Sequence, residues 1–285
     1  MKLCRFQKGS SHPRVGLVNN DSSVTDLSAT GIASLSSLLA THNLAASLPT
    51  MTESYPPRLK LSDIKLLPPV EQQEIWAAGV TYLRSKKARM EESDFSASAY
   101  DKVYDAPRPE IFFKSMPNKV VGSGDTVGIR KDARWNVPEP ELALVLSPSG
   151  KVVGYTICND MSSRDIEGEN LLYLPQAKIY DRSCAIGPWI RVAATEEEAR
   201  GWSIGIQILD QGKVVFSGET SVGQIKRSFD ELAGYLFRSQ TFPHGAILST
   251  GTGIVPGDDF TLAIGQVVRI NISGIGTLEN TVKVV

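Results

Sequence analysis

The chain has few cysteines and few histidines, with three of each among 285 residues. Cys4, Cys158 and Cys184 are widely spaced, so they fit neither a disulfide framework nor a paired zinc-ligand pattern. A nucleophilic cysteine needs a base such as histidine, and no motif here supplies one. We therefore expect reduced thiols and no cysteine-based catalysis.

The sequence also lacks an excess of charge of either sign. Thirty Lys and Arg residues balance thirty-one Asp and Glu residues, which leaves a formal charge of −1. Without a basic footprint, we expect no nucleic-acid partner. No run approaches the roughly 18 apolar residues of a membrane span, and the start lacks the apolar core of a signal peptide. We expect no membrane partner and a cytoplasmic location.

The composition is that of a folded globular protein, with 41% hydrophobic and 21% charged residues. Residues 1–70 look like a small N-terminal domain, because four prolines between residues 56 and 69 punctuate a linker. Residues 71–285 contain short β-like runs separated by turn signals, and one of these runs is 261–264. This pattern predicts a strand-rich α+β fold with a catalytic domain over residues 71–285.

Acidic residues precede an apolar run at residues 142–146. Side chains alternate along a strand, so Glu139 and Glu141 lie on one face and the leucines that follow lie on the other. The chain then turns and returns antiparallel toward Asp160. If Glu139 pairs opposite Asp160, the three carboxylates share one face, whereas a slip of one residue separates them.

Three carboxylates near an apolar sheet repel one another and raise their pKa values unless a cation lies among them. Oxygen ligands suit Mg²⁺, with Mn²⁺ or Ca²⁺ as alternatives, rather than zinc. The pattern alone leaves a second interpretation open, namely a solvated acidic strand end.

The segment 159–170 begins with good helix-capping residues, so we expect a helix to start there. Arg164 and Glu167 are three residues apart and would be neighbours on that helix, either at the site or as an exposed ion pair. Lys178 follows. A lysine near a dication acts as a base or stays charged and holds a carboxylate, although a lone lysine is ordinarily a surface residue.

Several motifs occur in one order along the second part of the chain: Gly79-Val80-Thr81-Tyr82, Phe112-Phe113-Lys114, Pro138-Glu139-Pro140-Glu141-Leu142-Ala143, Asn159-Asp160-Met161-Ser162-Ser163-Arg164-Asp165, Lys178 with Gly187-Pro188, Ser249-Thr250-Gly251-Thr252 and Gly274-Ile275-Gly276-Thr277. With these motifs, residues 71–285 resemble the fumarylacetoacetate hydrolase family.

The resemblance implies a mixed β-sandwich roll with a small N-terminal domain, and a homodimer or higher homo-oligomer. It implies Mg²⁺ held by Glu139, Glu141 and Asp160, and a small 2-oxo acid as substrate. It places the following residues in contact with the substrate: Tyr82, Ser85, Lys114, Arg164 and Thr252.

The sequence departs from the hydrolytic members of this family at two positions. Ser85 stands where those members carry the His that activates water, and Glu167 stands where they carry Gln. Two interpretations of the charged segment 84–93 stay open. In the first, Glu91 or Glu92 substitutes for the missing His; in the second, the segment is a solvated helix face. Both departures favour a reaction that needs no hydrolytic water.

Further runs are similar to the 2-keto-3-deoxy-pentonate (arabinonate) dehydratases of the family, which make 2-oxoglutarate semialdehyde: Gly-Val-Thr-Tyr-x-Arg-Ser at 79–85, Arg134 to Glu141 and Asp165 to Asn170. Our hypothesis is a Mg²⁺-dependent lyase with Lys178 as base and Glu167 as acid, or with these roles exchanged.

Three alternatives stay open. The first is a hydrolase that cleaves a C–C bond of an acylpyruvate or a 2,4-diketo-3-deoxy sugar acid. The second is a decarboxylase of oxaloacetate. The third is a catalytically silent member that serves as a binding or scaffold protein, because a fold does not fix a function.

Overall fold

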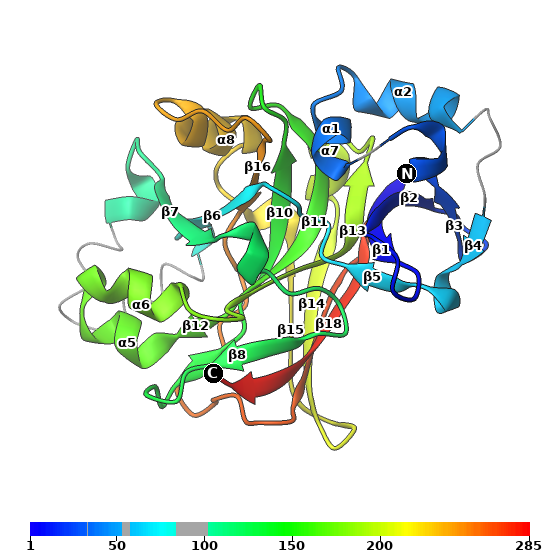
Figure 1. The fold of residues 1–285 in the computed structure, drawn as a ribbon. Coiled ribbons are helices and arrows are strands. Elements are labelled where there is room, and N and C mark those ends of the chain that lie inside the picture. The colour runs from blue at the N-terminus through cyan, green and yellow to red at the C-terminus, as the bar shows by residue number, and fades with distance from the viewer. Residues whose placement is uncertain (33, 53–57, 84–101) are drawn as a thin grey trace.

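The computed structural model describes residues 1–32, 34–52, 58–83 and 102–285. A large, mostly antiparallel sheet runs through these residues (Figure 1). Its strands follow one another in this order: β4 (Arg58–Lys60), β3 (Ser23–Asp26), β2 (Arg14–Val18), β1 (Lys2–Gln7), β13 (Cys184–Val192), β11 (Val152–Asp160), β10 (Pro140–Leu146), β16 (Ala246–Ser249), β6 (Glu74–Gly79) and β7 (Glu110–Ser115), with β5 (Lys65–Leu67) paired to β1.

A second sheet packs against the first. Its order is β15 (Lys213–Ser221), β14 (Ser203–Asp210), β17 (Val267–Ile272), β18 (Gly276–Val284) and β8 (Thr126–Ile129). Two short strands, β12 (Ser162–Ser163) and β9 (Asn136–Val137), form a separate pair. The strand-rich mixed fold with few helices agrees with the predicted class.

The described helices are short. They are α1 (Leu35–Leu39), α2 (Leu44–Met51), α5 (Arg164–Glu169), α6 (Leu174–Lys178), α7 (Glu196–Arg200) and α8 (Phe229–Phe237), with 3₁₀ turns at Leu27–Thr30, Leu61–Asp63, Pro117–Lys119, Leu171–Tyr173 and Val222–Gln224. Among the residues that the structure describes, none of the helices has the length and apolar character needed to cross a membrane.

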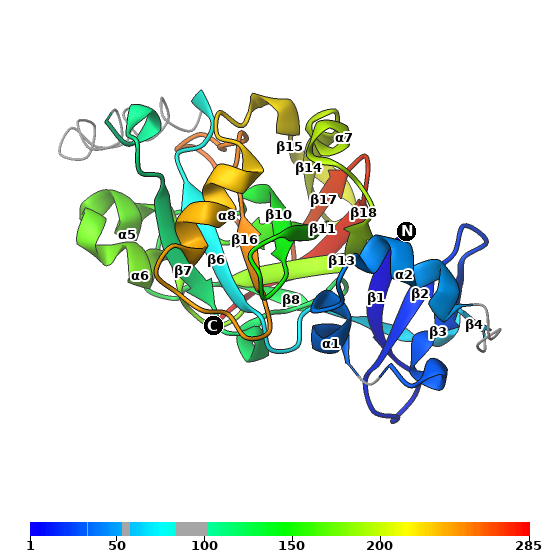
Figure 2. The ribbon, with the colours of Figure 1, turned by 90° about the horizontal axis from the view of Figure 1, so that it is seen from above.

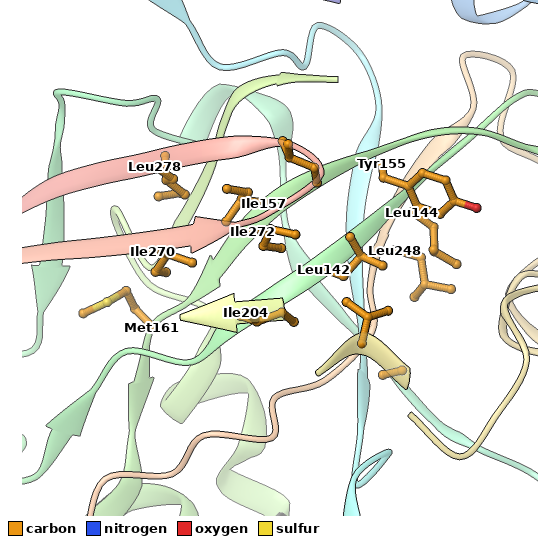
Figure 3. Close-up of a cluster of buried hydrophobic side chains, with 14 of the residues drawn as sticks. Leu142, Leu144, Tyr155, Ile157, Met161, Ile204, Leu248, Ile270, Ile272 and Leu278 are labelled. Carbon is orange, nitrogen blue, oxygen red and sulfur yellow. The ribbon is translucent and has the colours of Figure 1, made fainter. Parts of the chain in front are cut away.

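The main core lies between the two sheets, as Figure 3 shows. Leu142 and Leu144 of β10 meet Ile204 of β14 and Ile272 of β17, and all four side chains are fully buried. Ala143 of β10 faces the opposite side, where a second core lies under helices α1 and α2. The alternation predicted for this strand is therefore confirmed, and its two faces belong to two cores.

Residues 1–70 share a sheet with the remainder of the chain. Strand β1 pairs antiparallel with β13, with Lys2 opposite Arg191 and Leu3 opposite Ile190. Leu3 also belongs to the same core as Ala143 of the central strand β10. Figure 2, from above, shows β1 to β4 with α1 and α2 at one end of the molecule. Backbone hydrogen bonds between β1 and β13 therefore join residues 1–70 to residues 71–285. The domain boundary near residue 70 stays a prediction.

The prediction of a strand at residues 261–264 is wrong. The N–H of Leu262 donates to the carbonyl oxygen of Asn136 at 2.9 Å, and the N–H of Ala263 donates to the side chain of Gln266 at 2.9 Å. Ile264 then stands in a turn with 70% of its surface exposed. The backbone N–H groups of Leu262 and Ala263 each find a separate hydrogen-bond partner, so they do not have to pair with a neighbouring strand.

The helix predicted within segment 159–170 forms, but it begins at Arg164. Asn159 and Asp160 remain in β11, where they pair with Ala185 and Cys184 of β13. Pairing with a neighbouring strand satisfies their backbone groups, which outweighs the local preference of these residues for a helix cap.

The two-sided burial of β10 predicts a large cost for truncating one of its leucines. Leu144→Ala should lower the free energy of unfolding by about 2–5 kcal/mol, because it leaves a cavity between the sheets. Urea titration followed by circular dichroism measures this loss. Leu172→Ala is the matched control, since Leu172 is 83% exposed and its loss should change stability by less than about 0.5 kcal/mol. Equal effects of the two substitutions would contradict the assigned core.

Candidate functional site

The pairing of β10 with β11 brings the three predicted carboxylates together. Pro140 lies opposite Asn159 and Glu141 opposite Cys158, and the N–H of Asp160 donates to the carbonyl oxygen of Glu139 at 3.0 Å. Glu139 therefore lies opposite Asp160, and this conditional prediction of the register is confirmed. The carboxylates of Glu139, Glu141 and Asp160 each offer an oxygen within 4.8 Å of the others, and all three residues are buried.

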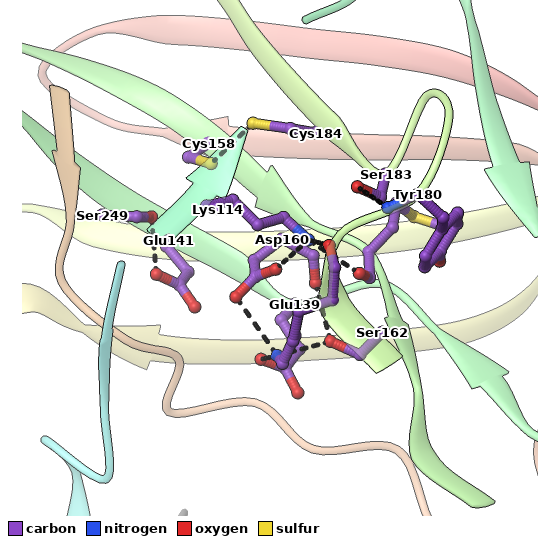
Figure 4. A network of polar contacts seen from close by, with 12 residues as sticks. Lys114, Glu139, Glu141, Cys158, Asp160, Ser162, Tyr180, Ser183, Cys184 and Ser249 are labelled. Atoms are coloured by element: carbon purple, nitrogen blue, oxygen red, sulfur yellow. Dashed lines mark hydrogen bonds and ion pairs between the residues drawn. The ribbon is translucent and has the colours of Figure 1, made fainter. Parts of the chain in front are cut away.

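Glu141 is held by two hydrogen bonds from the end of β16 and the turn that follows it; Figure 4 shows its carboxylate beside Ser249. The hydroxyl of Ser249, at the end of β16, donates to its Oε2 at 2.5 Å, and the N–H of Gly251 donates to the same oxygen at 2.7 Å. Burial raises the pKa of Glu141 well above its ordinary value, and the negative charge of Asp160 raises it further. A cation among these oxygens would remove that penalty on the charged carboxylate.

Lys178, the last residue of α6, extends its ammonium into this cluster. Nζ donates to Glu139 Oε2 at 2.7 Å, to Asp160 Oδ2 at 3.1 Å and to the hydroxyl of Ser162 at 2.5 Å. Only 2% of the residue is exposed, so the ordinary surface role of a lone lysine does not apply. An ammonium has three donors, and these three acceptors use all of them.

Lys114, on β7, is a second buried ammonium beside the cluster. Nζ lies 2.5 Å from Asp160 Oδ1 and donates to the carbonyl oxygens of Met161 at 3.0 Å and Lys178 at 2.6 Å. The residue has no exposed surface. Asp160 therefore lies between two lysines, with one carboxylate oxygen toward each.

Arg164 and Glu167 lie at the site from the first turn of α5. Arg164 Nη1 is 3.2 Å from Glu139 Oε1 and 3.6 Å from Glu167 Oε2, and the guanidinium lies 5.8 Å from the ring centre of Trp135. Both side chains are buried, so the alternative of an exposed ion pair is excluded. The predicted proximity of the two residues on one helix is confirmed.

The three carboxylates line a pocket. Lys178, Glu167 and Thr252 of the predicted residues line it with the three carboxylates, whereas Tyr82, Lys114 and Arg164 are not among the described residues that line it. Ser85, Glu91 and Glu92 lie outside the described residues. The described lining consists of Ala78, Gly79, Val80, Glu110, Phe112, Glu139, Glu141, Asp160, Glu167, Lys178, Gly251 and Thr252.

Glu110 is a pocket carboxylate that the sequence reasoning missed. It lies on β7 opposite Gly79 of β6, and a Cβ placed on Gly79 would come within 2.1 Å of Glu110 Oε2. The absence of a side chain at residue 79 therefore leaves the space that the Glu110 carboxylate fills. A signal was present, because Glu110 stands two and four residues before Phe112 and Lys114, which puts it on the face of the strand that carries the recognised motif.

The formal charges around the pocket fit a divalent cation. Five carboxylates lie at or beside it, and three cationic side chains accompany them, which leaves a formal charge of −2. The carboxylates are Glu110, Glu139, Glu141, Asp160 and Glu167, and the cations are Lys114, Arg164 and Lys178. One dication would neutralise the group, and a set of carboxylate oxygens suits Mg²⁺.

The fold and the acidic site are those of one family of proteins. Residues 74–283 match the model of the fumarylacetoacetate hydrolase C-terminal domain, which is most of the chain. The chain therefore belongs to the fumarylacetoacetate hydrolase family.

Within this family, the chain is similar to dehydratases of sugar acids. It is 49% identical over 217 residues to a protein of Haloferax volcanii named as a probable 2-keto-3-deoxyxylonate dehydratase, which covers 76% of this chain and 74% of that protein. It is 43% identical over 227 residues to the 2-dehydro-3-deoxy-D-arabinonate dehydratase of Saccharolobus solfataricus, covering 79% and 76% of the two chains. A solved 2-keto-3-deoxy-D-arabinonate dehydratase, complexed with magnesium and 2,5-dioxopentanoate, superposes with a TM-score of 0.85 at 35% identity over 100% of this chain and 99% of that one.

The geometry predicts that Glu141 is needed to bind Mg²⁺. Glu141→Gln should weaken Mg²⁺ binding at least about tenfold, because removing a ligand charge costs at least as much as disturbing a residue that only supports a ligand. Isothermal titration calorimetry of the protein with MgCl₂ measures the dissociation constant.

Glu169→Gln provides the control for this prediction. Glu169 belongs to α5, but its side chain is exposed and does not line the pocket. The control removes the same charge and should leave Mg²⁺ affinity within about twofold of the original protein, since exposed charges are screened by solvent. Unchanged affinity in Glu141→Gln would remove Glu141 from the metal site.

Proposed function

We propose that this protein is a Mg²⁺-dependent hydro-lyase that converts a 2-keto-3-deoxy-pentonate to 2,5-dioxopentanoate, which is 2-oxoglutarate semialdehyde. The observation that carries this conclusion is the group of three buried carboxylates under a pocket with ionisable walls. The protein is also similar over its whole length to a dehydratase complexed with magnesium and 2,5-dioxopentanoate, and this similarity supports the choice of reaction. The substrate is a small 2-oxo acid that loses one water molecule.

Glu139, Glu141 and Asp160 are the residues that would hold Mg²⁺. When bound, the dication would act as a Lewis acid on the C1 carboxylate and C2 oxo group of the substrate, which makes the C3 protons more acidic. These three carboxylates line the pocket, so the substrate's C1 end belongs beside them and its hydroxyl-bearing end toward the other lining residues.

The reaction needs one group to take a proton from C3 and another to give a proton to the departing C4 hydroxyl. Our hypothesis from the sequence makes Lys178 the base, but its Nζ is already engaged with three acceptors beside the metal-binding carboxylates. Glu110 lines the pocket from β7 and lies outside the group of three carboxylates that would hold the metal. We assign the C3 proton to Glu110 on this basis.

Glu167 is the group that we place near the departing hydroxyl. It lines the pocket, and its carboxylate lies within 3.6 Å of the Arg164 guanidinium. Glu167 enters this step protonated. Its proton and the C4 hydroxyl leave together as water, while the electron pair of the former C3–H bond forms the C3–C4 double bond. One C5 proton then moves to C3, which leaves a C4–C5 enol, and the proton of the C5 hydroxyl moves to C4, which produces the C5 aldehyde. One water is lost overall.

The remaining predicted residues have orienting roles in this proposal. Thr252 lines the pocket, and its hydroxyl is fixed within the turn by contacts of 3.2 Å with the carbonyl oxygen and the N–H of Ile254. Arg164 holds Glu139 and Glu167 from behind the pocket wall. Tyr82 packs under the same turn, because a Cβ on Gly253 would come within 2.6 Å of its ring. A cytoplasmic location and a homo-oligomer stay predictions.

Mass spectrometry of reaction products tests the proposed reaction directly. The protein is incubated with 2-keto-3-deoxy-arabinonate or 2-keto-3-deoxy-xylonate, in Mg²⁺ and separately in EDTA. We expect a product one water lighter in Mg²⁺ only, identified as 2,5-dioxopentanoate by its aldehyde. An acylpyruvate serves as the second substrate class. Two carbon fragments from the acylpyruvate, with both pentonates untouched, would replace the lyase by a C–C hydrolase.

The role of Glu110 is tested by proton exchange without any loss of water. 2-Oxopentanoate has the carbon chain of the substrate but neither of its hydroxyls, so a base can only exchange its C3 protons. Glu110→Gln should slow Mg²⁺-dependent deuterium uptake at C3 in D₂O at least about 100-fold, since a general base contributes about 10²–10⁴ in rate. Proton NMR follows the exchange.

Two further variants make this exchange experiment decisive. Glu169→Gln removes an exposed carboxylate and should exchange at the original rate. Lys178→Met removes the other candidate base. Exchange that survives in Glu110→Gln and disappears in Lys178→Met would return the role of base to Lys178.

A further inference from the structure

Lys114 ends the Phe112-Phe113-Lys114 motif and lies deeper in the structure than the pocket lining. It shares a strand face with Glu110 and Phe112, both of which line the pocket, but its own ammonium is fully buried beside Asp160. Figure 4 shows the Lys114 side chain reaching toward Asp160. A substrate contact therefore does not follow from the placement of this side chain.

The contacts of Lys114 connect two separate parts of the site. Its ammonium lies 2.5 Å from Asp160 Oδ1, and it donates to the carbonyl oxygen of the next residue, Met161, at 3.0 Å. Its remaining contact is the carbonyl oxygen of Lys178 at 2.6 Å. The carbonyl groups in the last turn of a helix lack partners within the helix, and Lys178 ends α6. One side chain thus holds the end of β11 and the end of α6.

The energetics of burial favour a role that depends on all three contacts. An ammonium that leaves water is stabilised only when its charge is paired and its donors are used. The charge of Lys114 is paired with one carboxylate, and its ammonium donates hydrogen bonds to two carbonyl oxygens. Asp160 depends on it in turn, because its Oδ2 is held at 3.1 Å by Lys178, whose own backbone Lys114 holds.

We infer that Lys114 is a positioning residue, which fixes Asp160 and Lys178 relative to each other and does not contact the substrate. The inference rests on the proposed function, since it concerns the same pocket. Its consequence is that loss of Lys114 should impair the chemical step while leaving the affinity for the substrate almost unchanged. Loss of a residue that only helps to bind the substrate would instead weaken the affinity for the substrate and leave the chemical step almost unchanged.

The test compares Lys114→Met with Lys119→Met. Methionine has a similar length without charge or donors, and Lys119 lies on the same segment of chain, with 48% of its side chain exposed in an ion pair with Asp181. At saturating Mg²⁺, Lys114→Met should lower kcat for the pentonate and the rate of C3 exchange of 2-oxopentanoate at least about tenfold. KM for the pentonate and the dissociation constant of 2-oxopentanoate should stay within about twofold. Lys119→Met should leave all four quantities unchanged.

Two outcomes would overturn the inference. A rise of tenfold or more in KM and in the dissociation constant of 2-oxopentanoate, with kcat retained, would make Lys114 a substrate contact. Unchanged values for all four quantities would remove it from the site altogether. If circular dichroism shows that Lys114→Met does not fold, Lys114→Gln is measured instead, because its amide keeps two N–H donors for the carbonyl oxygens and removes only the charge.

The exchange measurement separates failure of this inference from failure of the proposed function. If the original protein does not dehydrate either pentonate, the proposed function fails, but exchange of 2-oxopentanoate protons still reports the effect of Lys114. If the original protein dehydrates a pentonate and the Lys114 variants exchange and turn over at the original rate, the inference alone fails.

Discussion

The antiparallel pairing of β10 with β11 is the constraint on which the site depends. A strand can slip by one residue only by sending every side chain to the opposite face, and here that slip would separate Asp160 from both glutamates. The leucines of β10 prevent it, because they are buried in the core between the sheets when Glu139 and Glu141 share a face. Packing of apolar residues therefore sets the geometry of a charged cluster that is itself costly to bury.

The cost of that burial is offset by pairing, and the pairs come from distant parts of the chain. Lys178 from α6 lies against both Glu139 and Asp160. Lys114 from β7 lies against Asp160, and Arg164 from α5 lies against Glu139. Their charges do not fully balance the carboxylates around the pocket, and the excess of negative charge is what a dication needs. Burial raises the pKa of Glu141 above its ordinary value, and the negative charge of Asp160 raises it further.

Local patterns in the sequence were sufficient for those features that depend on alternation and short spacing. The two faces of β10 and the proximity of Arg164 to Glu167 follow from residues near one another in the chain. The acidic cluster followed from the sequence only on the condition that Glu139 pairs opposite Asp160, which the pairing of β10 with β11 meets. Local patterns did not predict where α5 starts or that residues 261–264 form no strand, because both depend on hydrogen bonds to distant parts of the chain. Asn159 and Asp160 bond to β13, and Leu262 bonds to Asn136, more than a hundred residues earlier.

Glu110 and Lys114 show why part of a site cannot be assigned from its motif alone. Alternation puts both on one face of β7, but the strand extends from the open pocket at Glu110 to the buried interior at Lys114. The depth of each position is set by what packs over it, namely β6 at Gly79 and the ends of β11 and α6 at Lys114. Two ionisable residues on one strand face can therefore have different roles, one toward the reacting carbon and the other toward the residues that hold the site in place.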